Sequence, residues 1–247
     1  MNSLFQQVAH RPWSMPQTAC VMYQRWHDLL FAHWPMDIKV LLPFIPAPLQ
    51  LDTFENQAWI GVVPFWMSGI RGRGLPPLPY LSRFPEINVR IYVTDGEKAG
   101  VWFLSLDAAN LVAVKTARKY FYLPYYHARM QCNLQQHDVH YYSKRIHTNA
   151  PPAEFAARYW PVGAAQKAEQ GSLEYWLTER YCLYTKNKWG DVCRAEIHHA
   201  PWPLQRAEAE IEVNSMADAC EITLPSIAPL LHFSKFQDVA VWPLRKV

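Results

Sequence analysis

Residues 86–94 read Glu-Ile-Asn-Val-Arg-Ile-Tyr-Val-Thr, and the alternation of this stretch decides the fold class. Successive side chains of a β-strand point to opposite faces of a sheet, so the stretch predicts a strand with one apolar and one polar face. The apolar face carries Ile87, Val89, Ile91 and Val93, and the polar face carries Glu86, Asn88, Arg90, Tyr92 and Thr94. The following Asp-Gly-Glu-Lys sequence at 95–98 predicts a turn, because Asp-Gly favours positive φ.

A second strand, residues 99–107, is predicted to pair with the first in antiparallel fashion. A loop of two or four residues brings apolar side chains together on one face, whereas a slip of one residue would mix both faces. With the even loop, Phe103 and Asp107 join the face of Glu86 and Arg90. The hairpin therefore predicts one face that combines charged groups with apolar ones.

A third segment, after a predicted helix from Ala108 to about Tyr120, extends this polar face. Tyr125 and His127 alternate with Tyr126 and Ala128, so the first pair is expected on the polar side and the second pair on the apolar side. Such a face commonly contacts water. A partly buried cavity is the alternative, since it accommodates apolar walls such as Phe103 together with a few convergent polar groups.

In the cavity interpretation, the polar face is a site for proton transfer on a small oxygenated compound. A carboxyl group beside apolar walls has a raised pKa, as a general acid near neutral pH requires. The planar fork of arginine suits a substrate carboxylate. The candidate catalytic residues are Glu86, Tyr125 and His127, and the candidate substrate-binding residues are Arg90, Asp107, Arg118 and Phe103.

Five runs of residues resemble the YqjF (DUF2071) family, and the resemblance covers most of the chain. They are His33-Trp34-Pro35, Leu51-Asp52-Thr53-Phe54, the residues from Phe84 to Arg90, those from Val101 to Asp107, and Leu123-Pro124-Tyr125. That family is similar, more distantly, to acetoacetate decarboxylase, whose barrel encloses a small cavity with a Schiff-base lysine and a nearby glutamate. The resemblance implies a mainly β fold with a few helices (α+β), built as an acetoacetate-decarboxylase-like antiparallel β-barrel.

The decarboxylase resemblance also implies roles for individual residues. Glu86 matches the cavity glutamate and Arg118 an arginine, but Tyr125 and Tyr126 stand where the decarboxylase has two lysines. A lysine amine forms the imine with a keto substrate, and a phenol cannot. The resemblance therefore implies the fold and the place of a pocket, and it argues against imine chemistry. Lys115 and Lys119, four apart on the predicted helix, are expected to face water.

Composition limits the function classes. The chain has 247 residues, half of them apolar, and can bury a sizeable core, so we favour a single domain over 1–247 to two small ones. The net charge of +3 is scattered, and nucleic acid is not expected as a partner. Five cysteines without a Cys-x-x-Cys spacing favour the cytoplasm over a disulfide framework. We expect no signal peptide and no membrane span.

Several segments give weaker indications. Apolar residues at three- and four-residue spacing predict a helix from about Thr18 to His33, with His33 as a hydrogen-bonded core residue. Residues 149–171, rich in proline, are predicted to form a long connection, and 68–85 a long loop whose arginines meet either solvent or an anionic substrate. His137 and His140 would point to opposite faces of a strand, so neither a metal nor another cofactor is expected.

Two functional hypotheses follow. In the first, the protein is a lyase, hydrolyase or isomerase that acts on a small carboxylate or keto compound by acid/base chemistry without a Schiff base. In the second, the same residues orient a small acid or aromatic compound in a non-catalytic binding protein. The absence of Gly-x-Ser-x-Gly from the sequence disfavours a hydrolase of that type. Both hypotheses need a small-molecule ligand, and both leave an oligomer possible.

Overall fold

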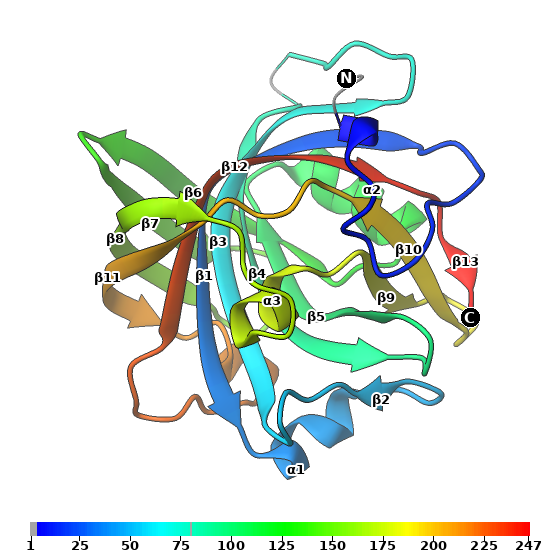
Figure 1. Ribbon diagram of the computed structural model, residues 1–247. Coiled ribbons are helices and arrows are strands. Elements are labelled where there is room, and N and C mark those ends of the chain that lie inside the picture. The colour runs from blue at the N-terminus through cyan, green and yellow to red at the C-terminus, as the bar shows by residue number, and fades with distance from the viewer. Residues whose placement is uncertain (1–3, 80) are drawn as a thin grey trace.

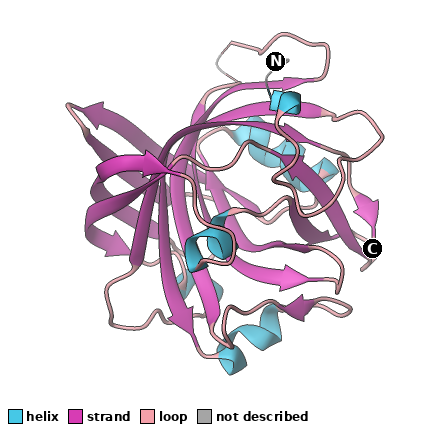
Figure 2. Ribbon diagram, in the orientation of Figure 1, coloured by secondary structure: helices cyan, strands magenta, loops and turns pink. Residues whose placement is uncertain are grey.

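The computed structural model describes residues 4–79 and 81–247, which form thirteen strands, three α-helices and three short 3-10 turns (Figure 1). The strands are β1 (Met22–Met36), β2 (Gln50–Leu51), β3 (Ala58–Gly72), β4 (Phe84–Thr94), β5 (Ala99–Ala108), β6 (Tyr125–Gln135), β7 (Asp138–Arg145), β8 (Glu154–Gln166), β9 (Cys182–Lys186), β10 (Val192–His198), β11 (Leu204–Asn214), β12 (Leu230–Val241) and β13 (Arg245–Lys246). The helices are α1 (Ile38–Leu41), α2 (Leu111–Tyr120) and α3 (Leu173–Thr178), and the 3-10 turns are Leu4–Gln6, Leu42–Phe44 and Asp218–Cys220. Figure 2 shows that strands dominate the chain, which confirms the predicted mainly β fold with a few helices.

These strands belong to one sheet that closes on itself twice. The larger ring runs β5-β6-β7-β8-β11-β12-β1-β3-β4 and closes where β4 pairs with β5. The smaller ring runs β10-β9-β5-β4-β3-β1-β12 and closes where β12 pairs with β10. The two rings therefore share β12, β1, β3, β4 and β5, and every shared strand presents one face to each ring.

The strand pairings are antiparallel in the described residues, except that β5 pairs with both β6 and β9 in parallel. The predicted antiparallel arrangement therefore holds except at these two pairings. Parallel neighbours need a crossover connection of about a dozen residues or more, usually through a helix. The segment that contains α2 supplies this connection between β5 and β6.

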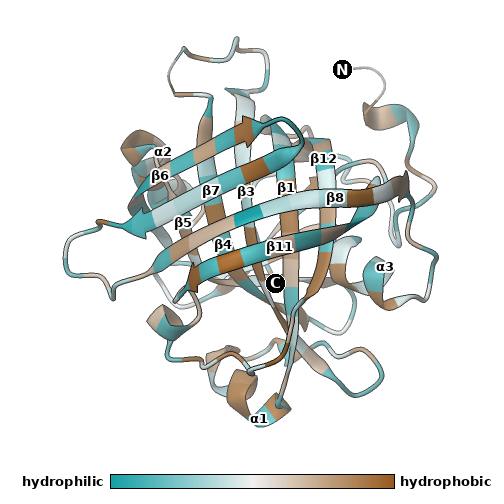
Figure 3. Cartoon of the chain, turned by 90° about the vertical axis from the view of Figure 1, so that its left-hand side faces the viewer, coloured by the Kyte–Doolittle hydropathy of each residue, from teal (hydrophilic) through white to brown (hydrophobic). Residues whose placement is uncertain are grey.

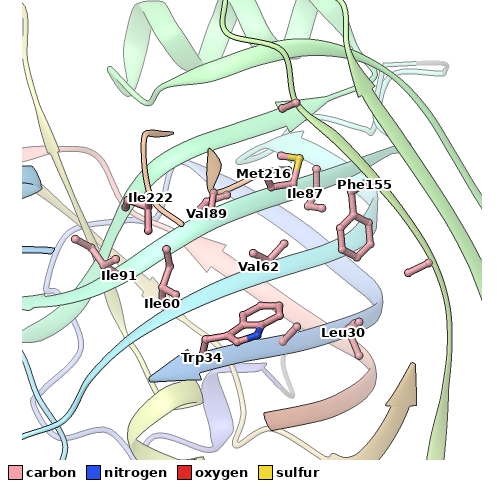
Figure 4. Packing of buried hydrophobic residues seen from close by; sticks show 14 of the residues in the cluster. Leu30, Trp34, Ile60, Val62, Ile87, Val89, Ile91, Phe155, Met216 and Ile222 are labelled. Carbon is pink, nitrogen blue, oxygen red and sulfur yellow. The ribbon is translucent and has the colours of Figure 1, made fainter. Parts of the chain in front are cut away.

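The interior of the larger ring is filled with apolar side chains. Ile87, Val89 and Ile91 of β4 are fully buried there. Figure 4 shows them packed with Val62 of β3 and Trp34 of β1. On the outer side of this ring, β11 exposes Glu208, Glu210 and Glu212. Figure 3 shows hydrophilic residues along β11 and the neighbouring strands.

The hairpin of β4 and β5 has the predicted four-residue loop, because Thr94 lies opposite Ala99. Arg90 still faces Phe103 as expected, but Val89 faces Ser105, so one residue is inserted in β5. Such a bulge makes two residues oppose one and reverses the sidedness beyond it. The predicted register is therefore wrong past this point. The side chain of Leu106 lies on the same face of the sheet as Glu86, and the side chain of Asp107 lies on the face of the larger ring.

Two other predictions of secondary structure are wrong. The segment predicted as a helix up to His33 is strand β1, whose central residues are buried on both faces because both rings use it. The predicted connection at 149–171 contains strand β8, in which Pro161 and Gly163 lie beside a register shift with β11. The helix predicted to end near Tyr120 is confirmed as α2. None of the helices in the described ranges is long and apolar enough to cross a membrane.

Candidate active site

The smaller ring encloses a cavity of about 530 Å³. Its walls come from the shared strands, from β9 and β10, from α2 and from the loop after β3. Large apolar side chains dominate these walls, among them Trp26, Met67, Phe84, Leu106 and Trp202. The volume falls within the range of about 300–1,000 Å³ that is typical of small-molecule sites.

The polar face of β4 supplies the charged groups of this cavity. Glu86 and Arg90 line it, and Asn88 lies between them on the same face and is buried. The alternation that sends Ile87 and Val89 into the larger ring sends these residues into the smaller one. Of the two interpretations of this face, the cavity is confirmed for Glu86 and Arg90, together with Phe103 of β5.

Glu86 is the carboxyl group of the site. Glu86 is only 3% exposed. The Tyr125 hydroxyl donates a hydrogen bond to Oε2 of Glu86 at 2.5 Å. The Tyr141 hydroxyl donates to the Glu86 carbonyl at 2.6 Å and so holds the backbone in place. Burial raises the pKa of Glu86 to about 7, against the opposing effect of hydrogen bonds from Tyr125 and Asn88. Both protonation states are therefore available near neutral pH.

Tyr125 is the hydrogen-bond donor to this carboxyl group. Burial and the neighbouring Glu86 raise the pKa of its phenol well above the usual range, so the hydroxyl keeps its proton. Tyr125 reaches the cavity because β6 pairs in parallel with β5, which places it beside Leu106. The next residue, Tyr126, faces the other way, where its ring packs against the Arg145 guanidinium at 3.9 Å from the ring centroid.

Arg90 lies in the cavity without an ionic partner. No Asp or Glu oxygen of the described residues lies within 4.0 Å of its guanidinium, and its Nε and Nη2 are buried and without a hydrogen-bond partner there. The aromatic ring of Phe31 lies 5.2 Å from the guanidinium carbon. Gly61, opposite Arg90 on β3, leaves room for the ring of His33, because a Cβ at Gly61 would approach that ring to 2.9 Å. A guanidinium in an apolar cavity without an opposite charge is a suitable binding site for an anion.

A second arginine, Arg180, lines the same cavity and was not predicted as a site residue. Its Nη1 donates to Asp52 Oδ2 at 2.5 Å and its Nε donates to the Trp176 carbonyl at 2.6 Å. Its Nη2 is buried and has no hydrogen-bond partner in the described residues. This arginine lies just after α3, and only its apolar neighbours Leu177 and Tyr181 could have indicated from the sequence that it is buried.

Two further residues missed by the sequence prediction come from the segment after β10. His199 lines the cavity, stacks on Tyr181 with 4.6 Å between ring centroids, and is held by the Arg180 carbonyl at 3.2 Å from Nε2. Burial lowers the pKa of His199 to about 4, so its ring is neutral near pH 7. Trp202 also lines the cavity, and its indole Nε1 is buried without a partner among the described residues.

Three of the predicted site residues lie elsewhere. Asp107 is on the opposite face of β5, where Arg145 donates to both of its oxygens at 2.6 and 2.8 Å. Arg118 is exposed on α2, outside the cavity lining, and donates to the Tyr125 carbonyl at 2.7 Å. His127 is half-buried beyond the cavity, and its backbone N–H contacts His147 Nδ1 at 3.1 Å. The bulge in β5 explains why Asp107 lies on the other face. His127 lies outside the cavity because β6 continues past it.

Two other predictions concern basic groups near this site. Lys115 and Lys119 are exposed on α2, as expected, and none of the described residues that line the cavity is a lysine. His33 is confirmed as a hydrogen-bonded core residue. It is fully buried, and its Nε2 lies 2.6 Å from the Tyr92 hydroxyl.

A comparison with models of protein families identifies the family of this chain. The model of the DUF2071 family, described as an uncharacterised conserved protein, matches residues 23–238. The chain belongs to this family. Within the family, it is 49% identical to the protein YqjF of Bacillus subtilis (strain 168) over 235 residues, which cover 94% of this chain and 95% of the relative. The resemblance seen in the sequence is therefore confirmed.

Solved structures share the fold of this DUF2071 protein at low sequence identity. Acetoacetate decarboxylase from Legionella pneumophila superposes with a TM-score of 0.64 at 11% identity, over 99% of this chain and 94% of that one. The enduracididine biosynthesis enzyme MppR, complexed with pyruvate, gives 0.62 at 7% identity, over 93% and 91%. An acetoacetate-decarboxylase-like enzyme from Sphingomonas wittichii RW1 gives 0.58 at 11% identity, over 97% and 99%. The predicted acetoacetate-decarboxylase-like fold is confirmed.

Proposed function

We propose that the cavity binds a carboxylate or keto compound and that Glu86 exchanges a proton with it. One observation carries this proposal. A buried carboxyl group with a pKa of about 7 and the half-buried guanidinium of Arg90, which has no acidic partner among the described residues, line the same largely apolar cavity. Groups with shifted pKa values in a cleft are candidates for a functional site.

The carboxyl group suits general acid/base catalysis. A group whose pKa lies near the working pH gives and takes protons with similar ease, and such catalysis contributes about 10²–10⁴ in rate. Tyr125 orients the Glu86 carboxyl through the hydrogen bond to Oε2. Proton transfer at a carbon next to a carbonyl group, as in a lyase, hydrolyase or isomerase, is the reaction class that this pair supports.

The arginines favour an anionic substrate. Arg90 lines the cavity and has no carboxylate partner among the described residues, whereas Arg180 is already committed to Asp52. We therefore assign Arg90 as the substrate clamp and Arg180 as a residue that adds positive potential beside it. The structural neighbour MppR is known in complex with pyruvate, a keto acid, which supports this class of ligand.

Deuterium exchange tests this function directly. The protein is incubated in D₂O at pD 7 with a panel of 2-keto and 3-keto acids, and exchange at the carbon next to the carbonyl is followed by proton NMR. We expect the wild type to accelerate exchange for at least one acid, Glu86→Gln to abolish the acceleration, and Arg90→Gln to raise the KM about tenfold or more. Lys115→Met serves as the control and should behave as the wild type.

The alternative is a non-catalytic binding protein, which the predominance of apolar side chains on the walls favours. The same experiment separates the two functions. Binding that depends on Arg90, without any exchange that depends on Glu86, would establish the binding protein. Binding that survives Arg90→Gln unchanged would disprove the proposed function of the cavity in either form.

A further inference from the structure

The opening of the cavity carries an unusual set of exposed apolar side chains. Five large apolar residues in the described part of the chain line the cavity and are also exposed, and we call them the apolar rim: Val21 (39%), Leu75 (65%), Leu78 (58%), Leu81 (38%) and Val112 (53%). They come from the start of β1, from the loop between β3 and β4, and from α2. In Figure 1 this loop is the cyan segment at the top of the view. Isolated exposed apolar residues are ordinary, but a cluster around one opening indicates contact with an apolar group.

The polarity of the cavity changes with depth along β4. Phe84 is the first residue of the strand and follows the rim loop, Glu86 comes next on the cavity face, and Arg90 lies four residues further on. At about 3.3 Å per residue, the Cα atoms of Glu86 and Arg90 are about 13 Å apart. Thr178 and Arg180, which are 4% and 5% exposed, line the cavity in the region beyond. The anion-binding groups are therefore at the deep end.

The size of the cavity exceeds the needs of a three- or four-carbon acid. A volume of about 530 Å³ lies in the middle of the range that holds ligands of drug size. A short acid held by Arg90 would leave the apolar walls around Trp26 and Met67 without contacts. A ligand that fills the cavity must be several carbons longer, and its outer part must be apolar to match these walls.

The position of Glu86 also limits the number of charges on the ligand. This carboxyl group lies between the rim and Arg90, so a second ligand carboxylate placed midway would approach it. Two carboxylates at close range repel each other, and each raises the pKa of the other. A ligand with one carboxylate at the deep end and no other charge avoids this conflict.

We infer that the ligand is an amphipathic monocarboxylate, with its carboxylate on Arg90 and its apolar tail passing Glu86 to leave the cavity between the β3–β4 loop and α2. This inference rests on the proposed function and specifies the substrate class of the same site. Leu78 and Val112 then face each other across the tail as the outermost contacts of the rim.

A series of straight-chain saturated acids from acetate to dodecanoate, with the primary alcohols of the same lengths, tests this inference. Affinities are measured by isothermal titration calorimetry on the full chain. We expect the affinity for the acids to rise by about three- to fourfold per methylene group through the middle of the series, because each buried methylene adds a similar increment. The alcohols should bind about tenfold or more weakly, and Arg90→Gln should remove that difference.

Leu78→Ser, with Leu134→Ser as its control, examines the exit of the tail. Both leucines are similarly exposed, at 58% and 54%, so neither change should affect folding, and Leu134 lies in β6, outside the cavity lining. We expect Leu78→Ser to weaken binding of the long acids about threefold or more and to leave acetate and butyrate unchanged. Leu134→Ser should change neither.

The outcomes separate the failure of this inference from that of the proposed function. Tightest binding of acetate to butyrate, still sensitive to Arg90→Gln, would overturn the amphipathic class and keep the proposed site. Octanedioate that binds more tightly than octanoate would also overturn it. Acids that bind no better than alcohols, or binding unaffected by Arg90→Gln at every length, would overturn both.

Discussion

The two rings of this protein share five strands, yet one ring is filled and the other is hollow. On the filled side, the buried acid Asp107 lies against Arg145, and most of the interior is occupied by apolar side chains. On the hollow side, Glu86 is bonded only to neutral donors and Arg90 has no carboxylate beside it, as far as the described residues go. Burying a charge without an opposite charge is costly. The comparison suggests a division of roles: the buried Asp107–Arg145 pair serves packing, whereas Glu86 and Arg90, which lack an opposite charge, are the groups that we propose to meet a ligand.

We expect the largest effect on stability from removing the charge of Asp107, which is paired with Arg145. Asp107→Asn leaves the Arg145 guanidinium, whose side chain is 1% exposed, without its anion, and should lower the free energy of unfolding by about 3–5 kcal/mol. Arg90→Gln, which removes an unpaired charge, should leave stability equal or higher. Urea unfolding of both variants checks this. Equal losses from the two changes would remove the distinction between the rings.

Truncation of an apolar side chain should cost more stability in the filled ring than in the hollow ring. Ile91→Ala, in the filled ring, should cost about 2–5 kcal/mol, because the residue is fully buried and the packed core cannot collapse around the space. Phe103→Ala, on the cavity wall, should cost about 1.5 kcal/mol, since part of its surface already faces open space. Thermal and urea unfolding give both values. A larger loss for Phe103→Ala would mean that the hollow ring is packed in solution.

The pH dependence of stability examines Glu86 itself. Its pKa is about 7 in the folded protein and 4.5 as the ordinary value, so the folded state holds the proton more tightly. The resulting contribution to stability is fully present below pH 4.5 and is lost as the pH rises through 7, by about 3 kcal/mol. Glu86→Gln should therefore gain about 3 kcal/mol relative to the wild type between pH 4.5 and 8.

Urea unfolding of the wild type and Glu86→Gln at several pH values measures this difference. Taking the difference between the two proteins cancels the buried histidines, whose lowered pKa values give the opposite slope. His27, His198 and His199 each have a pKa of about 4. Stability curves that run parallel for the two proteins would show that Glu86 is not the titrating group.

The smallest effect is expected from Arg118. This residue is exposed, donates to the Tyr125 carbonyl and lies 5.8 Å from the ring centroid of Tyr126. Arg118→Gln should therefore change the free energy of unfolding by about 0.5 kcal/mol or less. Ligand affinity should change less than about twofold, against tenfold or more for Arg90→Gln. Calorimetric titration of the two variants side by side gives the ratio. A large effect of Arg118→Gln would extend the site beyond the hollow ring.

Part of the site could be predicted because it lies on one strand. The alternation from Glu86 to Thr94 and the four-residue loop are local properties, and they identified Glu86, Arg90 and Phe103. Tyr125 followed from the same alternation in the third segment. Arg180, His199 and Trp202 could not be found in this way, because they come from segments about a hundred residues away and enter the cavity only when β9 and β10 close the smaller ring.

The sequence by itself determined that the chain is mainly β, that β4 has two unlike faces, and which residues those faces carry. Side-chain alternation is a property of each strand, so it needs no knowledge of its neighbours. Only the tertiary structure decided that the sheet closes twice, that a bulge near Leu104 turns Asp107 toward Arg145, and that the polar face encloses a cavity. Ring closure and bulges depend on how strands distant in sequence share the burial of their apolar faces, and no local pattern records this balance.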